Sequence, residues 1–212
     1  MESIIDFFLG PYSTTPLYDI FLESFVFFFG IASVIYAKKK NILVFPTGLV
    51  ATAISVYLLY KAGYYGDMTL NFYYSLMSIY GWYNWSRKKG DKAVLSITRT
   101  TNKEKSIGIV LFLLTVVITY AVYIGFEQEI ETVNYIDIFT SGLFFTAMWY
   151  MAKKKLENWT LWIIADIITI PLYAYRGLGI LSLQYLIFTV LAVQGYYAWK
   201  KDINKTQQTS LK

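Results

Sequence analysis

Two tryptophans and an aspartate lie on one face of the apolar segment formed by residues 158–175. Trp159, Trp162 and Asp166 are spaced i, i+3 and i+7, which places two indoles and a carboxylate in one stripe along a helix. Asp166 is roughly 12 Å along the axis from Asn158. Near the membrane centre, an ionised Asp facing lipid costs about 2.5 to 3.5 kcal/mol. We therefore expect the stripe to face a polar interior where rings and an acid can hold a small solute.

Each residue of this stripe also has a structural interpretation. Trp159 suits the aromatic belt at a membrane interface, whereas Trp162 lies deeper and suits that belt less well. Asp166 can form a hydrogen bond between helices. The sequence leaves both interpretations open for all three residues.

Three other apolar segments carry polar stripes at helical spacing. They contain Asn71, Tyr74, Ser75 and Ser78 in the first segment, Thr140, Ser141 and Phe144 in the second, and Gln184, Tyr185 and Phe188 in the third. We predict substrate contacts for Asn71, Tyr74, Thr140, Ser141, Phe144 and Gln184. Hydrogen bonds between helices or to backbone carbonyls are the alternative. Asp137, near the start of the second segment, is expected to be a solvated acid or a helix N-cap.

The residue types exclude several chemistries. The chain has no cysteine and no histidine, which removes thiol nucleophiles, imidazole bases, disulfides and most transition-metal ligand sets. Walker, G-x-S-x-G and H-E-x-x-H patterns are also missing from the sequence. We therefore predict no enzymatic activity, no cofactor and no bound metal.

The composition is that of a membrane protein. Of the 212 residues, 56% are hydrophobic and 16% are charged, against about 45 to 50% and about 25% in soluble domains. The 20 Tyr, 15 Phe and 6 Trp suit a protein with two wet interfaces. The net charge of +5 comes from lysines clustered between apolar segments, so we expect a lipid bilayer and no nucleic acid as a partner.

Seven apolar segments are about long enough to cross a membrane as helices. They cover residues 20–37, 42–60, 68–85, 107–126, 135–152, 158–175 and 177–199. The basic residues lie at alternate connections, and the remaining connections carry only Lys61 and Arg176. By the positive-inside rule, the N-terminus is outside and the C-terminus is cytoplasmic.

Short blocks of sequence recur in the two halves of the chain. Residues 37–40 return as 152–155, and residues 80–85 return in similar form as 194–199. The first three apolar segments and the last three both begin outside the membrane, and the fourth connects them. The pattern therefore predicts parallel repeats in a 3+1+3 bundle of the SWEET-like class. Chance similarity between two Lys-rich and two aromatic boundaries is the alternative.

This pattern predicts a single integral membrane domain over residues 1–212. Its parts are repeat one at 18–86, a linker helix at 106–127, repeat two at 134–201 and a disordered tail at 203–212.

Two regions resemble the PnuC family of vitamin transporters. Residues 155–166, with the W-x-x-W motif of Trp159 and Trp162, and the following residues 171–178 resemble the sixth helix of that family. Residues 66–74 and the Y-G-W-x-x-W motif from Tyr80 to Trp85 resemble its third helix. The resemblance extends from the first predicted span to Trp199.

The resemblance implies a homotrimer in the bacterial cytoplasmic (inner) membrane that carries nicotinamide riboside by facilitated diffusion. A cytoplasmic kinase would then trap the substrate as its phosphate. Carried over by motif, Asn158, Trp159, Trp162 and Asp166 belong to the binding site. Many members of the family have Gln where this chain has Asn71, which leaves thiamine or riboflavin as alternative substrates.

Both nicotinamide riboside and thiamine contain a flat cationic ring, which an indole face attracts by about 0.5 to 2 kcal/mol per contact. Asp166 can balance this charge or accept hydrogen bonds from ribose hydroxyls. We predict a uniporter for a pyridine nucleoside. A membrane receptor or assembly protein that does not transport is the alternative from another class.

Overall fold

The computed structural model describes residues 4–62, 65–89, 92–93, 95–126 and 130–210. The described residues form eight α-helices, one short 3-10 helix and a hairpin of two-residue strands. The elements are α1 Ile4–Leu9, η1 Gly10–Tyr12, α2 Leu17–Lys38, α3 Val44–Ala62, α4 Tyr65–Ser86, β1 Lys88–Lys89, β2 Lys92–Ala93, α5 Asn102–Phe126, α6 Thr132–Ala152, α7 Glu157–Tyr175 and α8 Gly179–Ser210. The predicted all-α fold is confirmed, and each of the seven predicted segments overlaps a helix of its own, from α2 to α8, although α3 and α8 begin two residues later than the predicted segments.

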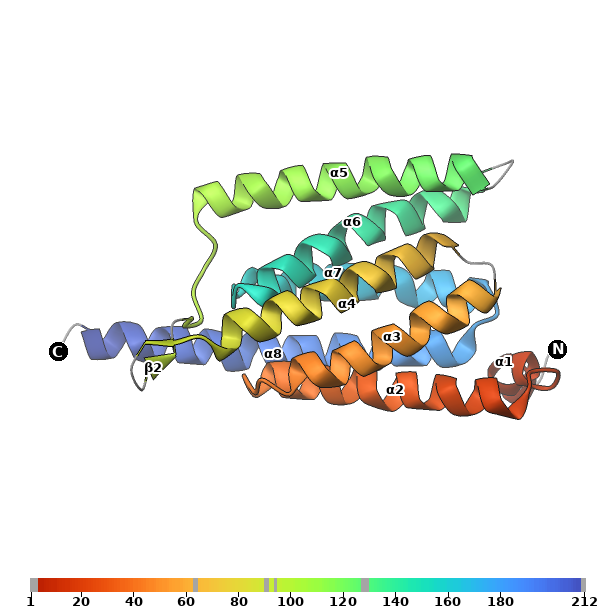
Figure 1. The fold of residues 1–212 in the computed structure, drawn as a ribbon, viewed down its shortest axis with the longest axis horizontal. Coiled ribbons are helices and arrows are strands. Elements are labelled where there is room, and N and C mark those ends of the chain that lie inside the picture. The colour runs from red at the N-terminus through yellow and green to blue at the C-terminus, as the bar shows by residue number, and fades with distance from the viewer. Residues whose placement is uncertain (1–3, 63–64, 90–91, 94, 127–129, 211–212) are drawn as a thin grey trace.

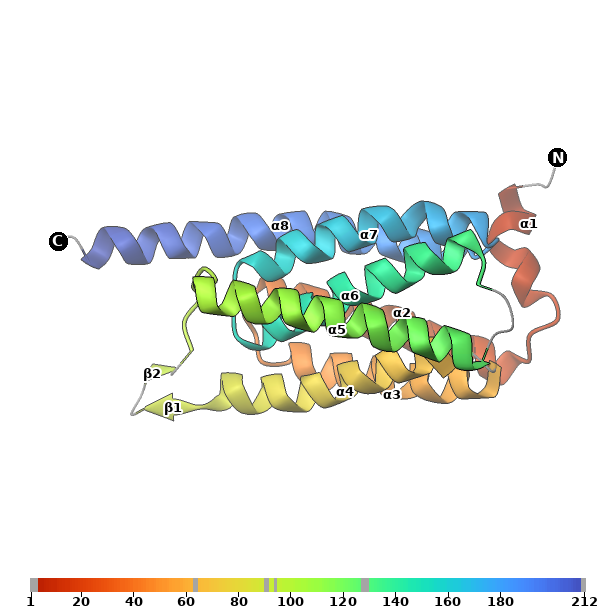
Figure 2. The ribbon, with the colours of Figure 1, turned by 90° about the horizontal axis from the view of Figure 1, so that it is seen from above.

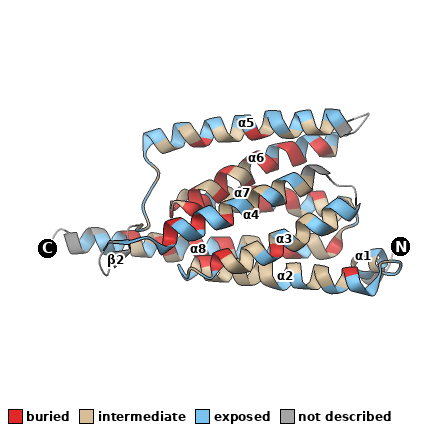
Figure 3. Ribbon diagram, viewed as in Figure 1, coloured by how far each residue is buried: buried red, intermediate tan, exposed pale blue. Residues whose placement is uncertain are grey.

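Within the described part of the chain, four helices are long and apolar enough to cross a membrane. They contain Leu17–Lys38, Val44–Lys61, Asn102–Gly125 and Gly179–Thr206. Large apolar side chains on these helices are exposed, including Val110 and Val117 of α5 at 61% and 63%. Much of the α5 ribbon is accordingly in the exposed class (Figure 3). A soluble protein rarely leaves apolar surface of this extent uncovered, so lipid is the natural covering.

Six helices pack in a closed ring. In order around the ring they are α2, α3, α4, α6, α7 and α8, and α8 packs again against α2. The linker helix α5 lies outside this ring, against α6 (Figures 1 and 2). Helix α6 is the most enclosed, with thirteen of its 21 residues buried. In this order, α3 and α7 occupy opposite positions in the ring.

The first helix of each half ends in the same way. We call α2–α4 the first half and α6–α8 the second half. Lys40 after α2 and Lys154 after α6 adopt left-handed conformations, with φ of 59° and 53°. The next residue's N–H closes each helix, from Asn41 to the Tyr36 carbonyl and from Lys155 to the Tyr150 carbonyl, both at 2.9 Å. A left-handed residue with such a bond is a common helix terminus.

The last helix of each half hydrogen-bonds the first helix of the other half. Trp85 of α4 donates its indole N–H to the Met151 carbonyl of α6 at 3.3 Å. Trp199 of α8 donates to the Ala37 carbonyl of α2 at 3.1 Å. In both bonds the second-half residue lies 114 positions after its first-half counterpart. The two bonds therefore join the halves reciprocally. Each gives a second donor to a helix-end carbonyl that already accepts a backbone N–H, from Lys154 at Met151 and from Lys40 at Ala37.

Aromatic rings fill the space around these bonds. Phe45 meets Trp85 edge-on at 5.0 Å, and Trp159 meets Trp199 edge-on at 5.5 Å. We call these four residues the tryptophan core. Glycine makes room for it, because a Cβ at Gly81 would lie 2.2 Å from the Phe45 ring. A Cβ at Gly195 would lie 2.7 Å from the Trp159 ring.

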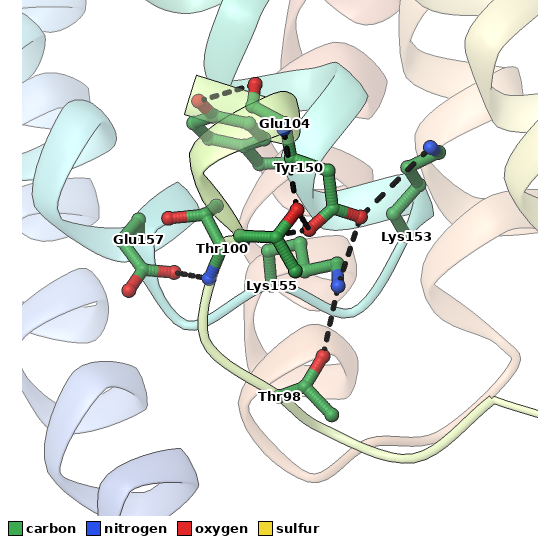
Figure 4. Close-up of polar contacts among 8 residues, drawn as sticks. Thr98, Thr100, Glu104, Tyr150, Lys153, Lys155 and Glu157 are labelled. Carbon is green, nitrogen blue, oxygen red and sulfur yellow. Dashed lines mark hydrogen bonds and ion pairs between the residues drawn. The ribbon is translucent and has the colours of Figure 1, made fainter. Parts of the chain in front are cut away.

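The connection between α4 and α5 is anchored on the turn between α6 and α7 (Figure 4). Thr98 exchanges backbone hydrogen bonds with Lys154 and Leu156 at 3.2 and 2.9 Å. Lys155 pairs with Glu104 at 2.9 Å and donates to the Thr98 hydroxyl at 3.0 Å. This network holds the linker helix against the second half.

Lys154 adds a contact between this connection and the tryptophan core. Its ammonium donates to the Leu95 carbonyl at 3.2 Å and lies 4.4 Å from the centre of the Trp85 ring. Burial lowers the pKa of the Lys154 ammonium, and the positive charge of Lys40 lowers it further. The cation–π contact and the hydrogen bond offset part of the free energy that burying the charged ammonium costs.

The end of the chain differs from the sequence-based expectation. Helix α8 continues to Ser210, whereas we expected a disordered tail at 203–212, of which 211–212 lie outside the described residues. Two contacts extend the helix past the predicted span, because Asp202 pairs with Lys40 and Ile203 is only 9% exposed against the tryptophan core. At the other end of the bundle, Phe7 of α1 packs against Gly179 at the start of α8.

We expect Gly81→Ala and Gly195→Ala each to lower the thermal stability of the purified protein in detergent. The added methyl group has no room, and overpacking of this kind costs about 1 to 3 kcal/mol. Gly125→Ala is the matched control, because no atom lies within 4 Å of a Cβ there and alanine favours helix. Equal melting temperatures for all three variants would contradict the close packing described here.

Candidate functional site

Four helices of the ring bring aromatic side chains together. Trp162 of α7 lies 6.3 Å from Tyr74 of α4 and 5.4 Å from Phe144 of α6, measured between ring centres. Phe144 in turn lies 5.9 Å from Tyr185 of α8. We call these four residues the aromatic cluster. It joins predicted site residues from three separate polar stripes.

Asp166 follows Trp162 by about one turn of α7 and is only 1% exposed. Its carboxylate is within electrostatic range of the Tyr74 and Tyr185 phenols. Among the described residues, neither Asp166 Oδ1 nor the Tyr74 hydroxyl has a hydrogen-bond partner. Buried polar atoms left unpaired cost about 1 to 3 kcal/mol each. The Tyr74 hydroxyl and Asp166 Oδ1 are therefore two buried polar atoms that can hydrogen-bond a ligand.

The two predicted amides lie in different surroundings. Gln184 is 6% exposed, and its Nε2 would be 3.2 Å from a Cβ at Gly30, so this side chain reaches from α8 to α2. Asn71 is half-buried and donates to the Asp67 carbonyl of its own helix at 3.0 Å.

Thr140 and Ser141 do not join the aromatic cluster through the contacts of the described chain. The Thr140 hydroxyl donates to the Ile136 and Asp137 carbonyls, both at 3.0 Å. Ser141 lines a separate cavity of about 80 Å³ between α4, α5 and α6, together with Tyr73 and Tyr123. The polar stripe of α6 thus divides between two sides of the helix.

Asn158 and Trp159 lie at the end of α7, in and beside the tryptophan core. Trp159 is 2% exposed and packs on Trp199 and Gly195. Asn158 is fully buried and donates to the Lys155 carbonyl. Trp159 and Trp162 share a helical face, yet Trp159 packs in the tryptophan core and Trp162 in the aromatic cluster.

The prediction that Asp137 is a solvated acid or a helix N-cap is wrong, because the residue is buried within α6, whose N-cap is Glu131. Asp137 also has a partner that sequence periodicity did not indicate. Its carboxylate accepts hydrogen bonds from Arg176 at 3.0 Å and from the Tyr123 hydroxyl at 2.9 Å. In the first half, Lys61 at the end of α3 pairs with Asp19 near the start of α2. The only signal in the sequence was the recurrence of Tyr60-Lys61 as Tyr175-Arg176. Each pair ties the second helix of its half to the first.

The arrangement as a whole is that of a helical membrane transporter. Apolar helices form a ring, and the buried rings, acid and amide lie on the faces that the ring encloses, where sites for small molecules occur in such bundles.

Comparison with known proteins gives the family. The model of the nicotinamide mononucleotide transporter family matches residues 20–201, so the chain belongs to this family. The nicotinamide riboside transporter PnuC of Escherichia coli (strain K12) is 25% identical over 193 residues, which cover 80% of this chain and 81% of that protein. The PnuC of Neisseria mucosa is 27% identical over 200 residues, covering 88% and 74% of the two chains.

The fold also matches a solved structure. The crystal structure of the vitamin B3 transporter PnuC superposes with a TM-score of 0.69 at 22% identity, covering 87% of this chain and 83% of that one. The predicted resemblance to the PnuC family is thereby confirmed. Together with the four apolar helices, these matches identify a multi-pass membrane transporter.

We expect Trp159→Ala to destabilise the protein more than Trp162→Ala does. Trp159 is buried in a close-packed layer, where a Trp-to-Ala change costs about 3 to 5 kcal/mol, whereas Trp162 is only partly buried. Melting temperatures in detergent measure the difference. A larger loss of stability for Trp162→Ala would contradict the assignment of Trp159 to the tryptophan core and of Trp162 to the aromatic cluster.

Proposed function

We propose that this protein is a uniporter that carries nicotinamide riboside across the bacterial cytoplasmic membrane. The observation that carries the proposal is that α7 carries the Trp162 indole of the aromatic cluster and, one turn later, the buried Asp166 carboxylate, whose Oδ1 has no hydrogen-bond partner among the described residues. The pyridinium ring of the riboside is flat and cationic, so it can stack on the indole while the carboxylate balances its charge. Relatives named nicotinamide riboside transporters support this choice of substrate.

The charges around the site favour the riboside over its phosphorylated form. Helices α4, α6 and α7 contain no lysine or arginine. A phosphate dianion in this site would lose its hydration without gaining a cationic partner, and that loss is costly in a low-dielectric interior. We therefore propose the nucleoside as the substrate, although the family model is named for the mononucleotide.

The proposed binding residues are the ones that the sequence indicates. They are Asn71, Tyr74, Thr140, Ser141, Phe144, Asn158, Trp159, Trp162, Asp166 and Gln184. In this proposal Trp162 and Phe144 hold the ring and Asp166 its charge, while Gln184 is placed to bind the carboxamide or a hydroxyl. Asn158 and Trp159 border the site at the end that the tryptophan core closes.

The proposed topology has seven spans in a 3+1+3 parallel repeat, with the N-terminus outside and the C-terminus in the cytoplasm. The matching contacts at an interval of 114 residues support a duplication of three-helix units. The lysine clusters at the ends of α2, α6 and α8 support the orientation. Rocking of one half against the other would then expose the site alternately to each side.

We also propose how the carrier works in the cell. Repeat one covers 18–86, the linker helix 106–127 and repeat two 134–201. The chain assembles as a homotrimer. A uniporter only equilibrates its substrate, so net uptake depends on a cytoplasmic kinase that converts the riboside to an impermeant phosphate.

Counterflow in liposomes tests the function. Vesicles loaded with unlabelled nicotinamide riboside should accumulate external labelled riboside saturably, and unlabelled thiamine or riboflavin should compete poorly. Asp166→Asn and Trp162→Ala should each lower the exchange rate about tenfold or more, because each removes a contact worth about 1 to 2 kcal/mol. Riboside binding without exchange would indicate a receptor, and preferential exchange of thiamine or riboflavin would contradict the proposed substrate.

Single cysteines test the topology directly, because the chain contains no cysteine of its own. Leu17→Cys and Tyr175→Cys, at positions 85% and 80% exposed, should react with a membrane-impermeant maleimide in intact cells. Lys39→Cys and Lys201→Cys should react only after the membrane is permeabilised. The opposite pattern would invert the proposed orientation.

A further inference from the structure

The linker helix α5 leaves a groove between itself and α4. It packs along α6, and the cavity of about 80 Å³ that Ser141 lines is enclosed by α4, α5 and α6. We call this cavity the linker groove. The described residues that line it include none of the aromatic cluster, so the groove is separate from the candidate substrate site.

The linker groove follows the helix axes and opens on the outside of the bundle. Its lining extends from Asp67 to Tyr73 on α4 and from Thr115 to Tyr123 on α5, a length of about 9 to 12 Å at about 1.5 Å per residue. Ile118, which also lines the groove, is 50% exposed. The opening therefore lies on the surface of α5 that lipid covers.

The walls of the groove are mainly apolar. The Tyr73 and Phe145 rings stack with 3.3 Å between their centres, and both line the groove together with Leu70, Ile118 and Val122. A void between such groups forfeits the dispersion contacts that a filled space would provide. Because the groove opens to lipid, an acyl chain is the natural molecule to fill it.

The hydroxyl groups of the lining use their protons within the protein. Tyr73 donates to the Phe145 carbonyl at 3.1 Å, Thr115 to the Leu111 carbonyl at 2.8 Å, and Tyr123 to a carboxylate at 2.9 Å. The lone pairs that remain on these oxygens only accept hydrogen bonds. A polar group that binds here must therefore bring its own donors.

One end of the groove carries a negative charge. Asp67 lies in the first turn of α4 and lines the groove, and its carboxylate is within electrostatic range of the Tyr123 phenol. No lysine or arginine is among the described residues of the lining. Since helix ends lie at the level of the lipid headgroups, this carboxylate favours a headgroup that contains an ammonium.

We propose that the linker groove binds one molecule of phosphatidylethanolamine. One acyl chain fills the space between α4 and α5, and the primary ammonium of the headgroup lies at Asp67. In the proposed orientation this lipid belongs to the outer leaflet. An acyl chain gains little by exchanging lipid tails for apolar side chains, so the headgroup decides which lipid binds. The site does not depend on which solute the protein carries.

Native mass spectrometry of the purified protein tests this site. The protein is delipidated in detergent and offered phosphatidylethanolamine, phosphatidylcholine or phosphatidylglycerol with the same acyl chains. It should retain phosphatidylethanolamine about fivefold more than either of the others, because only this headgroup combines a positive charge with N–H donors for the carboxylate.

Two variants locate the lipid, each with a matched control. Thr119→Trp fills the groove and should abolish most of the retention, whereas Val117→Trp places the same ring on α5 at a position that is 63% exposed and does not line the groove. Asp67→Asn should remove the preference for phosphatidylethanolamine. Glu131→Gln should keep it, because Glu131 is an exposed acid at the start of α6 outside the groove.

Equal retention of the three lipids by the wild type would overturn the proposal. A preference that survives Asp67→Asn would also overturn it, and this variant leaves the groove open, so it decides the case even if Thr119→Trp does not fold. Retention in Thr119→Trp equal to that in Val117→Trp would place the lipid elsewhere on the protein. Riboside exchange in liposomes is measured separately, so failure of the lipid site leaves the proposed function standing.

Discussion

Two indole N–H groups hold the halves of this protein together at one end. A buried indole N–H that has no hydrogen-bond partner is costly in an apolar surrounding. Trp85 and Trp199 each donate to a helix-end carbonyl in the opposite half. Separation of the halves at this end would therefore take both indole N–H groups from these partners and open the tryptophan core. The aromatic cluster lies about one turn farther along α7, at Trp162.

The repeated framework carries unlike surfaces. Packing contacts recur at an interval of 114 residues, as in the pairs Phe45–Trp85 and Trp159–Trp199. Other equivalent positions do not recur, since Trp162 and Asp166 correspond to Gly48 and Thr52. Close packing accounts for the recurring contacts, because Gly81 lies against the Phe45 ring in the first half and Gly195 lies against the Trp159 ring in the second.

Much of the fold was predictable because apolar segments of about 20 residues indicate helices directly. The burial of Asp166 followed from the cost of a charge in lipid. Sequence spacing could not separate Trp159 from Trp162, because both lie on one helical face and only the approach of Gly195 assigns the first to the tryptophan core. Periodicity also gave no partner for Asp137, since Arg176 is 39 residues away. The helical continuation of α8 depends on a contact of Asp202 with Lys40 from the other half.

The most direct test of this account is a structure of the protein determined with nicotinamide riboside bound. The account predicts the pyridinium ring against the Trp162 indole, with the Asp166 carboxylate in contact with the ligand. Electron density for the ligand at another place on the protein, or a Trp162 side chain that points outward to lipid, would contradict it.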